Sequence, residues 1–243
     1  MTEAPAPLGH RIFDDADALA RGAAEWICRI AQAREGRFAI CLAGGATPQR
    51  LYRRLAEPPI ASRFPWSRAH WFWGDERFVP RDHPDSNYRM AHDALLSRVP
   101  VPEENIHRIP TEGLAPEEAA AAYQDDLERY HAAPALAPER PLFDVMLLGI
   151  GEDGHTASLF PGDPALEERR RWALAVLGAR PEPRITLTYP ALASSRDLAF
   201  LAAGASKREI VRRVWAGDAS LPAARVRPVG RLHWLVDRAA APR

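Results

Sequence analysis

Residues 38–55 read FAICLAGGATPQRLYRRL, and this stretch indicates the class of fold. Its first five residues form a short, continuous apolar run, which is typical of a strand buried on both faces of a parallel sheet. Gly44-Gly45 predicts a tight turn after the strand. Thr47 followed by Pro48 then predicts a helix, with Thr47 as its N-cap and Pro48 in the first helical position. The stretch therefore encodes one strand–turn–helix unit.

Strands and helices alternate in the same way along the rest of the chain. We expect strands over residues 70–73, 106–109, 143–148, 172–177, 184–188, 197–202 and 232–236, and helices over 14–33, 87–97, 116–131 and 206–215. This alternation predicts an α/β fold with a mostly parallel sheet. The Pro-rich stretch 134–141 is the only candidate boundary, and we interpret it as a loop inside a single domain spanning residues 1–243.

Composition excludes several classes of protein. Lys+Arg and Asp+Glu both number 32, so the formal net charge is zero. That balance removes the electrostatic argument for a nucleic-acid partner, which requires clustered positive charge. No apolar run approaches the roughly 18 residues of a membrane span, and no signal peptide is visible in the first ten residues. Cys28 and Cys41 cannot form a disulfide framework, so we expect a cytoplasmic protein without a membrane partner.

Polar residues follow four of the predicted elements, at 44–47, 75–77, 153–155 and 206–207. In an open parallel sheet, ligands bind beyond the carboxyl ends of the strands. We therefore expect these four clusters to converge on one pocket.

Gly44 and Gly45 have a physical use in such a pocket. Glycines let the backbone approach a ligand closely, and the helix that follows presents unpaired N–H groups to an anion. The alternative is an ordinary tight turn. Lys207 and Arg184 could supply cations to the same anion, and Lys207 is the only lysine among the 32 basic residues.

The helix that contains Lys207 supports this hypothesis. Ser206 and Glu209 have the spacing of a capping box, which predicts that Ser206 is the N-cap. Lys207 then lies in the first helical turn, where a cation is electrostatically unfavourable unless an anion is bound there.

His155 is the candidate general base, because it follows a glycine at a strand end and its ordinary pKa lies near neutrality. Asp153 could orient it. We interpret the other seven histidines as structural, with His10 and His131 exposed. No Cys/His cluster indicates a metal, and no Gly-x-Ser-x-Gly motif indicates an acyl-serine route.

The remaining polar motifs have structural interpretations of their own. For the triplet Asp75-Glu76-Arg77 the alternative to a functional role is a solvated loop with local salt bridges. Residues 82–87 have the composition of a turn and helix cap. The aromatic run 71–73 is better explained as core, and the arginine run 169–171 as a solvated face.

The motifs together resemble the 6-phosphogluconolactonase family. The resemblance lies in LAGGATP, WFWGDERFVPRDHPDSN, FDVMLLGIGEDGHTASLFPG, RITLT and GASKREIV, which occur in that family's order over roughly residues 38–215. The family is similar to the glucosamine-6-phosphate deaminases and shares their Rossmann-like, mostly parallel sheet with helices on both faces.

The resemblance implies hydrolysis of 6-phospho-D-glucono-1,5-lactone to 6-phospho-D-gluconate in the oxidative pentose phosphate pathway, with no cofactor and no metal. It also assigns residues. Gly44, Gly45, Thr47, Arg184 and Lys207 match phosphate-binding positions, His155 matches the base, and Asp75, Arg77 and Asp153 match positions around the sugar.

Several alternatives stay open at this point. A sugar-phosphate isomerase or deaminase would use the same scaffold, but the deaminases carry an acidic residue five positions after the histidine, where this chain has Phe160. A sugar-phosphate sensor without catalysis is a third possibility. The sequence does not decide whether Asp75 or Asp153 orients His155, which group protonates the leaving oxygen, or whether the protein is a monomer or a weak homodimer.

Overall fold

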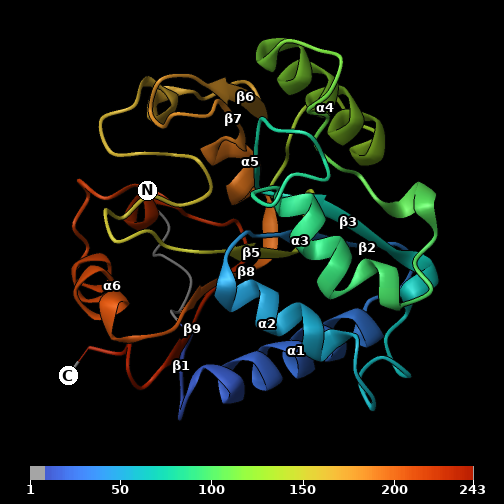
Figure 1. The fold of residues 1–243 in the computed structure, drawn as a ribbon, viewed down its shortest axis with the longest axis vertical. Helices are drawn as coiled ribbons and strands as arrows, with labels where there is room; N and C mark the ends of the chain where they lie inside the picture. Colours follow the sequence, from blue (N-terminus) through green and yellow to red (C-terminus); the bar gives the residue numbers. More distant parts are fainter. Residues whose placement is uncertain (1–8, 243) are drawn as a thin grey trace.

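The computed structural model describes residues 9–242, and its centre is a six-stranded parallel sheet (Figure 1). The strand order is β1-β9-β8-β5-β2-β3, and every neighbouring pair is parallel. The strands are β1 (Gly9–Phe13), β2 (Phe38–Leu42), β3 (Ala69–Trp73), β5 (Phe143–Leu148), β8 (Ser195–Ala202) and β9 (Arg231–Asp237). The predicted fold class, a mostly parallel α/β sheet, is confirmed.

Helices cover the sheet on both sides. The helices are α1 (Ala16–Ala33), α2 (Ala46–Leu55), α3 (Asn87–Ala94), α4 (Pro116–His131), α5 (Tyr189–Ala193) and α6 (Arg208–Trp215). The chain runs from β1 to β2 to β3 in one direction and then returns through β5, β8 and β9. Because parallel crossovers are right-handed, this reversal places α1 and α2 on one face and the later connections on the other. Figure 1 shows α1 and α2 below the central strands and α4 above them.

The reversal also fixes where a ligand can bind. The chain leaves β2 toward β3 on one side and leaves β5 toward β8 on the other, so the neighbouring strands β2 and β5 form a topological switch point. The connections diverge there and leave a crevice at the carboxyl ends of the two strands.

A second, three-stranded antiparallel sheet was not predicted. It has the order β4-β7-β6, formed by β4 (Asp75–Arg77), β7 (Arg184–Leu187) and β6 (Ala173–Val176). The strand predictions at 172–177 and 184–188 are confirmed, but these strands lie outside the parallel sheet. The triplet 75–77 is not a solvated loop, because Asp75 and Glu76 are buried and pair with β7.

The buried core follows the apolar runs. β2 and β5 are buried along their whole length, as is typical of central strands in a parallel sheet covered on both faces, and β5 buries Asp144 along with its apolar residues. The aromatic run 71–73 belongs to the core, as predicted, with Trp71 and Phe72 fully buried. Asp15 begins α1 by accepting a hydrogen bond from the N–H of Ala18 at 2.7 Å.

Both predicted caps were wrong. Gly45, with φ of 104°, is the N-cap of α2, so Thr47 lies inside the helix and caps nothing. Ser206 lies in a single 3-10 turn, Ala205–Lys207, and α6 begins only after it, without a side-chain cap. Glu209 instead pairs with Arg212 at 2.7 Å. In both cases a glycine with positive φ at the strand end sets where the helical turn begins.

Other local predictions also need correction. Residues 106–109 form no strand, only a single bridge between Ile106 and Trp71. His131 is buried at the end of α4, whereas His10 is exposed as expected. β1 and α5 were not predicted: the residues of β1 are mostly exposed and carry no apolar pattern, and α5 is only five residues long.

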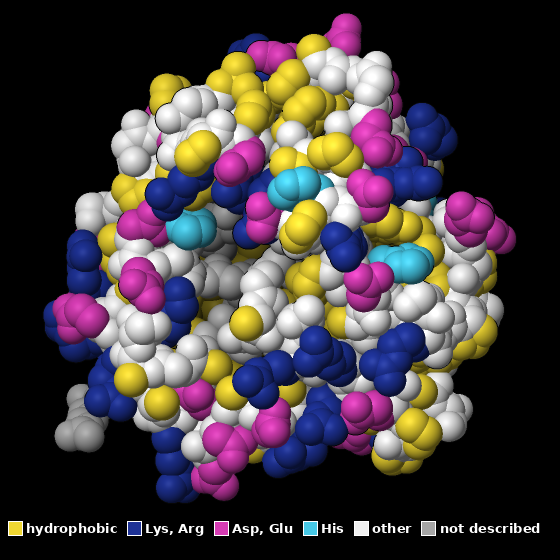
Figure 2. Space-filling model, viewed as in Figure 1, with side chains coloured by type: hydrophobic (Ala, Val, Ile, Leu, Met, Phe, Trp, Pro, Cys, Tyr) yellow, Lys and Arg dark blue, Asp and Glu magenta, His cyan; other side chains and the backbone are white. Residues whose placement is uncertain are grey.

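Two properties of the molecular surface bear on partners. Within residues 9–242 no helix is both long and apolar enough to span a bilayer. Figure 2 shows basic and acidic side chains interspersed over the face viewed in Figure 1.

Candidate active site

A pocket lies at the switch point, beyond the carboxyl ends of β2 and β5. Its walls come from the turn after β2, from β4, from β7, from the loop after β5 and from the 3-10 turn before α6. The predicted site residues that line it are Gly44, Gly45, Asp75, Arg77, His155, Arg184 and Lys207. The four polar clusters therefore converge as expected. Thr47 and Asp153 are the two predicted residues that do not line the pocket.

His155 lies in a tight turn that Asp153 closes. Oδ1 of Asp153 accepts hydrogen bonds from the backbone N–H of His155 at 3.1 Å and from its Nδ1 at 2.5 Å. The backbone N–H of Gly151 donates to the carbonyl of His155 at 2.9 Å. Because Nδ1 donates to Asp153, the Nε2 atom of a neutral imidazole carries the free lone pair.

Asp153 remains an anion in this turn. Burial by itself raises the pKa of Asp153. The hydrogen bonds from His155 and the positive charge of Arg180 outweigh burial and hold the pKa below its ordinary value. Asp153, and not Asp75, is the carboxylate hydrogen-bonded to His155.

Asp75 is held by other partners. Its Oδ2 accepts from the hydroxyl of Ser158 at 2.6 Å, and its carbonyl oxygen accepts from Nδ2 of Asn87 at 2.9 Å. Asp75 and Ser158 are both buried, so this contact fixes β4 against the loop that carries His155.

Glu76 is a structural residue that sequence reasoning missed. Its carboxylate accepts from the backbone N–H groups of Asn87 and Tyr88, both at 2.7 Å, and from the hydroxyl of Ser86 at 3.0 Å. It therefore satisfies the unpaired donors at the start of α3. Burial nevertheless raises the pKa of Glu76, and these backbone hydrogen bonds only partly oppose it.

Asn87 is a pocket residue that we did not predict. It lines the pocket and packs so closely on Gly44 that a Cβ at position 44 would lie 2.1 Å from its Oδ1. The turn after β2 therefore needs glycine at position 44. Residues 82–87 were interpreted only as a turn and helix cap. The contact between Asn87 and Gly44 was missed because it joins segments far apart in sequence.

The lining of the pocket is rich in cations. Arg77, Arg184 and Lys207 all line it. The Nε atoms of Arg77 and Arg184 are buried and have no hydrogen-bond partner in the part of the chain that the structure describes. Burial lowers the pKa of Arg184, and the nearby charge of Arg77 lowers it further. A bound anion would relieve this crowding of positive charge.

The start of α2 adds backbone donors next to the Gly44-Gly45 turn, which also lines the pocket. The first bonded N–H of the helix is that of Gln49, which donates to the carbonyl of Gly45 at 3.0 Å. Pro48 has no N–H. The backbone N–H groups of Ala46 and Thr47 are therefore the donors at the start of α2 that have no partner within the helix.

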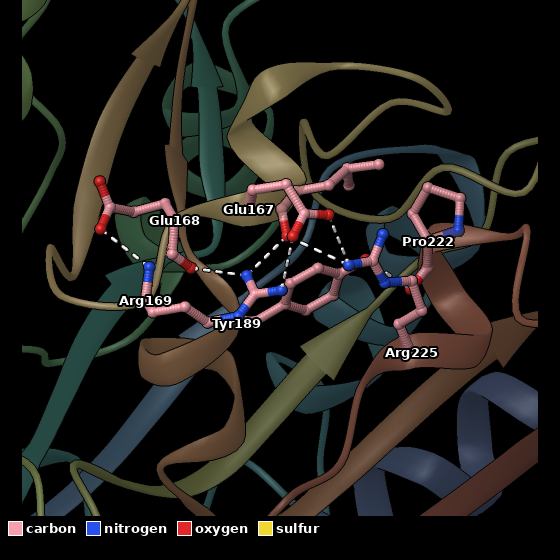
Figure 3. Close-up of polar contacts among 7 residues, drawn as sticks. Glu167, Glu168, Arg169, Tyr189, Pro222 and Arg225 are labelled. Atoms are coloured by element: carbon pink, nitrogen blue, oxygen red, sulfur yellow. Dashed lines mark hydrogen bonds and ion pairs between the residues drawn. The ribbon is translucent and has the colours of Figure 1, made fainter.

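Arg225 joins the turn 222–225 to Glu167 and Tyr189 (Figure 3). Arg225 donates to Glu167 at 2.9 Å and lies 5.3 Å from the ring centroid of Tyr189. The hydroxyl of Tyr189 donates to the carbonyl of Pro222 at 3.0 Å. The 3-10 turn Pro222–Arg225 in turn holds the histidine loop, since the N–H of its second residue, Ala223, donates to the carbonyl of Gly154 at 3.0 Å.

No metal centre accompanies the pocket: among residues 9–242, no three His, Cys, Asp or Glu side chains are grouped to hold an ion.

Known proteins with similar sequences and structures agree with one another. The family described as glucosamine-6-phosphate isomerases/6-phosphogluconolactonase matches residues 14–234. The chain is 45% identical over 212 residues to a 6-phosphogluconolactonase of Nostoc sp., covering 85% of each chain. It is 39% identical to a 6-phosphogluconolactonase of Streptomyces coelicolor, covering 99% of this chain and 95% of the relative.

A solved structure extends the likeness to three dimensions. The crystal structure of 6-phosphogluconolactonase from Thermotoga maritima superposes with a TM-score of 0.82 at 30% identity, covering 96% of this chain and all of that chain. The family match spans most of the chain, including every predicted site residue. The chain therefore belongs to the glucosamine-6-phosphate isomerase/6-phosphogluconolactonase family.

Proposed function

We propose that this protein hydrolyses 6-phospho-D-glucono-1,5-lactone to 6-phospho-D-gluconate in the oxidative pentose phosphate pathway. One observation carries the proposal: His155, hydrogen-bonded to Asp153 at 2.5 Å, lines the same pocket as Arg77, Arg184 and Lys207. A base and a cationic wall in one pocket suit a substrate that has an electrophilic carbonyl and a phosphate. The names of the relatives support the same reaction.

In this proposal His155 is the general base. Asp153 fixes the tautomer, so that Nε2 removes a proton from water as the water oxygen attacks the lactone carbonyl. The reaction needs no covalent intermediate. A base positioned in this way is typically worth about 10²–10⁴-fold in rate.

The tetrahedral intermediate places negative charge on the former carbonyl oxygen. Arg77 is suited to stabilise it, because its Nη1 is anchored on the carbonyl of Asp85 at 2.5 Å and its Nε has no protein partner within the described residues. When the intermediate collapses, the ring oxygen leaves and takes the proton from the imidazolium of His155. The ring opens and the free acid is released.

The phosphate group fixes the substrate for this attack. We assign it to the turn Gly44-Gly45, the first N–H groups of α2, including that of Thr47, and the cations Arg184 and Lys207. Binding at a site separate from the reacting carbon converts binding energy into orientation of that carbon.

Aminosugar deamination is the second candidate, and one contact disfavours it. Position 160, where the deaminases carry an acidic residue, is a buried phenylalanine whose ring lies 4.9 Å from that of His155. A carboxylic acid is therefore absent from the point where the deaminase pattern requires one. A monomeric glucosamine-6-phosphate deaminase superposes with a TM-score of 0.79 at 20% identity, a likeness that concerns the fold alone.

The test is a lactonase assay coupled to 6-phosphogluconate dehydrogenase and corrected for spontaneous ring opening. We expect rapid turnover by the wild type and a loss of about 10²–10⁴-fold in His155→Ala. Binding of the phosphorylated lactone with turnover no faster than buffer would instead establish a sensor. Release of ammonia from glucosamine 6-phosphate would establish the deaminase.

Two further properties stay predictions. Size-exclusion chromatography with light scattering tests the monomer or weak homodimer, and cell fractionation tests the cytoplasmic location. Some relatives carry "chloroplastic" in their names, so the compartment varies within the family.

A further inference from the structure

We propose that Arg180 is a positioning residue of this site, which holds the ring of His155 in place by binding two of the groups that the ring contacts. The proposal rests on the proposed function for its kinetic consequences, but its structural consequence can be measured without turnover. Arg180 belongs to none of the motifs that carry the family resemblance. It lies in the hairpin at 177–183 that joins β6 to β7.

The first contact is with the carboxylate of Asp153. Nη2 of Arg180 lies 2.8 Å from Oδ2 of Asp153, and the other oxygen, Oδ1, accepts from Nδ1 of His155. The two oxygens of one carboxylate are thus divided between the arginine and the histidine. Without Arg180, only the two hydrogen bonds from His155 to Oδ1 would hold the carboxylate.

The second contact is with the ring of Phe160. The guanidinium carbon of Arg180 lies 4.7 Å from the centroid of that ring, within the range of a cation–π interaction. The same ring packs against His155 at a centroid distance of 4.9 Å. No hydrogen bond joins Arg180 to His155 itself among residues 9–242, so Arg180 acts on the imidazole only through these two neighbours.

The contacts of Arg180 are not needed for folding. The side chains of Arg180 and Asp153 are each 41% exposed, and exposed ion pairs contribute little to the free energy of unfolding. The ion pair can instead determine the orientation of the Asp153 carboxylate and the net charge beside His155. Arg180 compensates the negative charge of Asp153 beside the imidazole.

Arg180→Met tests the proposal. Methionine keeps an apolar side chain over Phe160 but removes the positive charge and the N–H donors of the guanidinium group. We expect kcat to fall by about 10- to 100-fold, since small misplacements of a catalytic group have effects of this size. KM should stay within about twofold, because Gly44, Arg184 and Lys207 bind the phosphate elsewhere. Arg180→Lys, which keeps the charge, should recover part of the loss.

The pH dependence supplies a readout that a purely structural role would not move. In Arg180→Met the acid limb of the kcat profile should shift to higher pH, because the uncompensated Asp153 stabilises the imidazolium. The other charged groups of the pocket are unchanged in the variant: Asp75 and Arg77 from β4, Arg184 from β7 and Lys207 from the turn before α6. Arg180→Lys should leave the limb close to that of the wild type.

A matched control exists on the outside of the molecule. Arg169 makes the same two kinds of contact, 3.2 Å to the carboxylate of Glu167 and 6.0 Å to the ring centroid of Tyr189 (Figure 3). It does not contact Asp153 or Phe160. Arg169→Met should therefore leave kcat and the pH profile unchanged.

The ring signal of His155 in an NMR titration, identified with His155→Asn, separates this proposal from the proposed function. The pH midpoint of that signal should rise in Arg180→Met and not in Arg169→Met, whether or not the protein hydrolyses a lactone. An unchanged midpoint and an unchanged kcat in Arg180→Met would overturn the role of Arg180. A shifted midpoint in a protein without lactonase activity would support Arg180 and refute the lactonase.

Discussion

Gly151→Ala should disable the enzyme without unfolding it. A Cβ at this position would lie 2.0 Å from Nδ1 of His155 and 2.6 Å from Oδ1 of Asp153. These are the two atoms that form the 2.5 Å hydrogen bond of the dyad. A methyl group at 151 and this hydrogen bond cannot exist together.

The size of the effect follows from the distances. The imidazole must retreat by about 1.4 Å to reach the 3.4 Å of an ordinary contact. A misplacement of about 1 Å can cost about 10²-fold in rate, so we expect kcat to fall by about 10²-fold or more, which is about 2.7 kcal/mol in activation free energy. The upper limit is the loss of the base itself, about 10²–10⁴-fold.

Stability should change little, because the displaced ring can move toward solvent. The side chain of His155 is 31% exposed, and the φ of Gly151 lies outside the left-handed region. We expect the melting temperature to stay within about 2 °C of the wild type, which calorimetry measures. KM should also be preserved, since the phosphate wall is untouched.

A double-mutant cycle makes the test sharp. If Gly151→Ala acts through His155, then adding it to His155→Ala should slow the enzyme no further, although each single variant is slow. The coupled lactonase assay measures all four proteins. Wild-type turnover in Gly151→Ala, or a double variant slowed by the product of the two single effects, would refute the claim that a Cβ at position 151 acts by displacing His155.

Three further predictions concern binding and stability. Lys207→Ala should raise KM for the phosphorylated lactone by about 10-fold and leave KM for unphosphorylated gluconolactone unchanged, so equal effects on both in steady-state kinetics would remove the phosphate assignment. Asp197→Asn should lower the free energy of unfolding at pH 7 by about 1–3 kcal/mol, because the carboxylate of Asp197 accepts from Arg231 at 2.9 Å and His233 at 2.7 Å. Burial raises the pKa of Asp197, but those partners outweigh it and hold the pKa below its ordinary value. The contribution of Asp197 is therefore present above about pH 4 and lost as pH falls through the lowered pKa, so urea titrations should show the gap to the wild type closing only below about pH 4. Phe143→Ala, at a fully buried position in β5, should cost about 3–5 kcal/mol in the same urea titrations, and a cost under 1 kcal/mol would contradict the packing described.

The sequence predicts best the elements whose signal is local. β2 and β5 begin and end where expected, because short, mostly apolar runs bounded by turn residues are typical of buried strands. α4 was likewise predicted to the residue, since its pattern is amphipathic and Pro116 fixes its start.

Elements defined by distant partners escaped prediction. β4 is a charged triplet that becomes a strand only because β7 pairs with it. Its middle residue, Glu76, is buried because α3 offers it backbone donors 11 and 12 residues away. Nothing in the triplet itself distinguishes this from a solvated loop.

The residues of the candidate site also fall into those that local sequence indicated and those that depend on distant partners. Residue types indicated His155, Lys207 and the Gly-Gly turn, and the structure brings them to one pocket. The supporting residues were missed because their partners are remote in sequence. Ser158 reaches Asp75 across 83 residues, and Arg180 reaches Asp153 across 27.

The pairing of β1 with β9 has a consequence for biosynthesis. Gly9 lies opposite His233, so on the ribosome the first strand emerges long before the strand that completes its ladder. Until residues 231–237 leave the exit tunnel, both β1 and the open side of β8 are unpaired edges exposed to other nascent chains. The sheet can close only after β9 has emerged, and until then these two edges are the part of the nascent chain that most needs protection from aggregation.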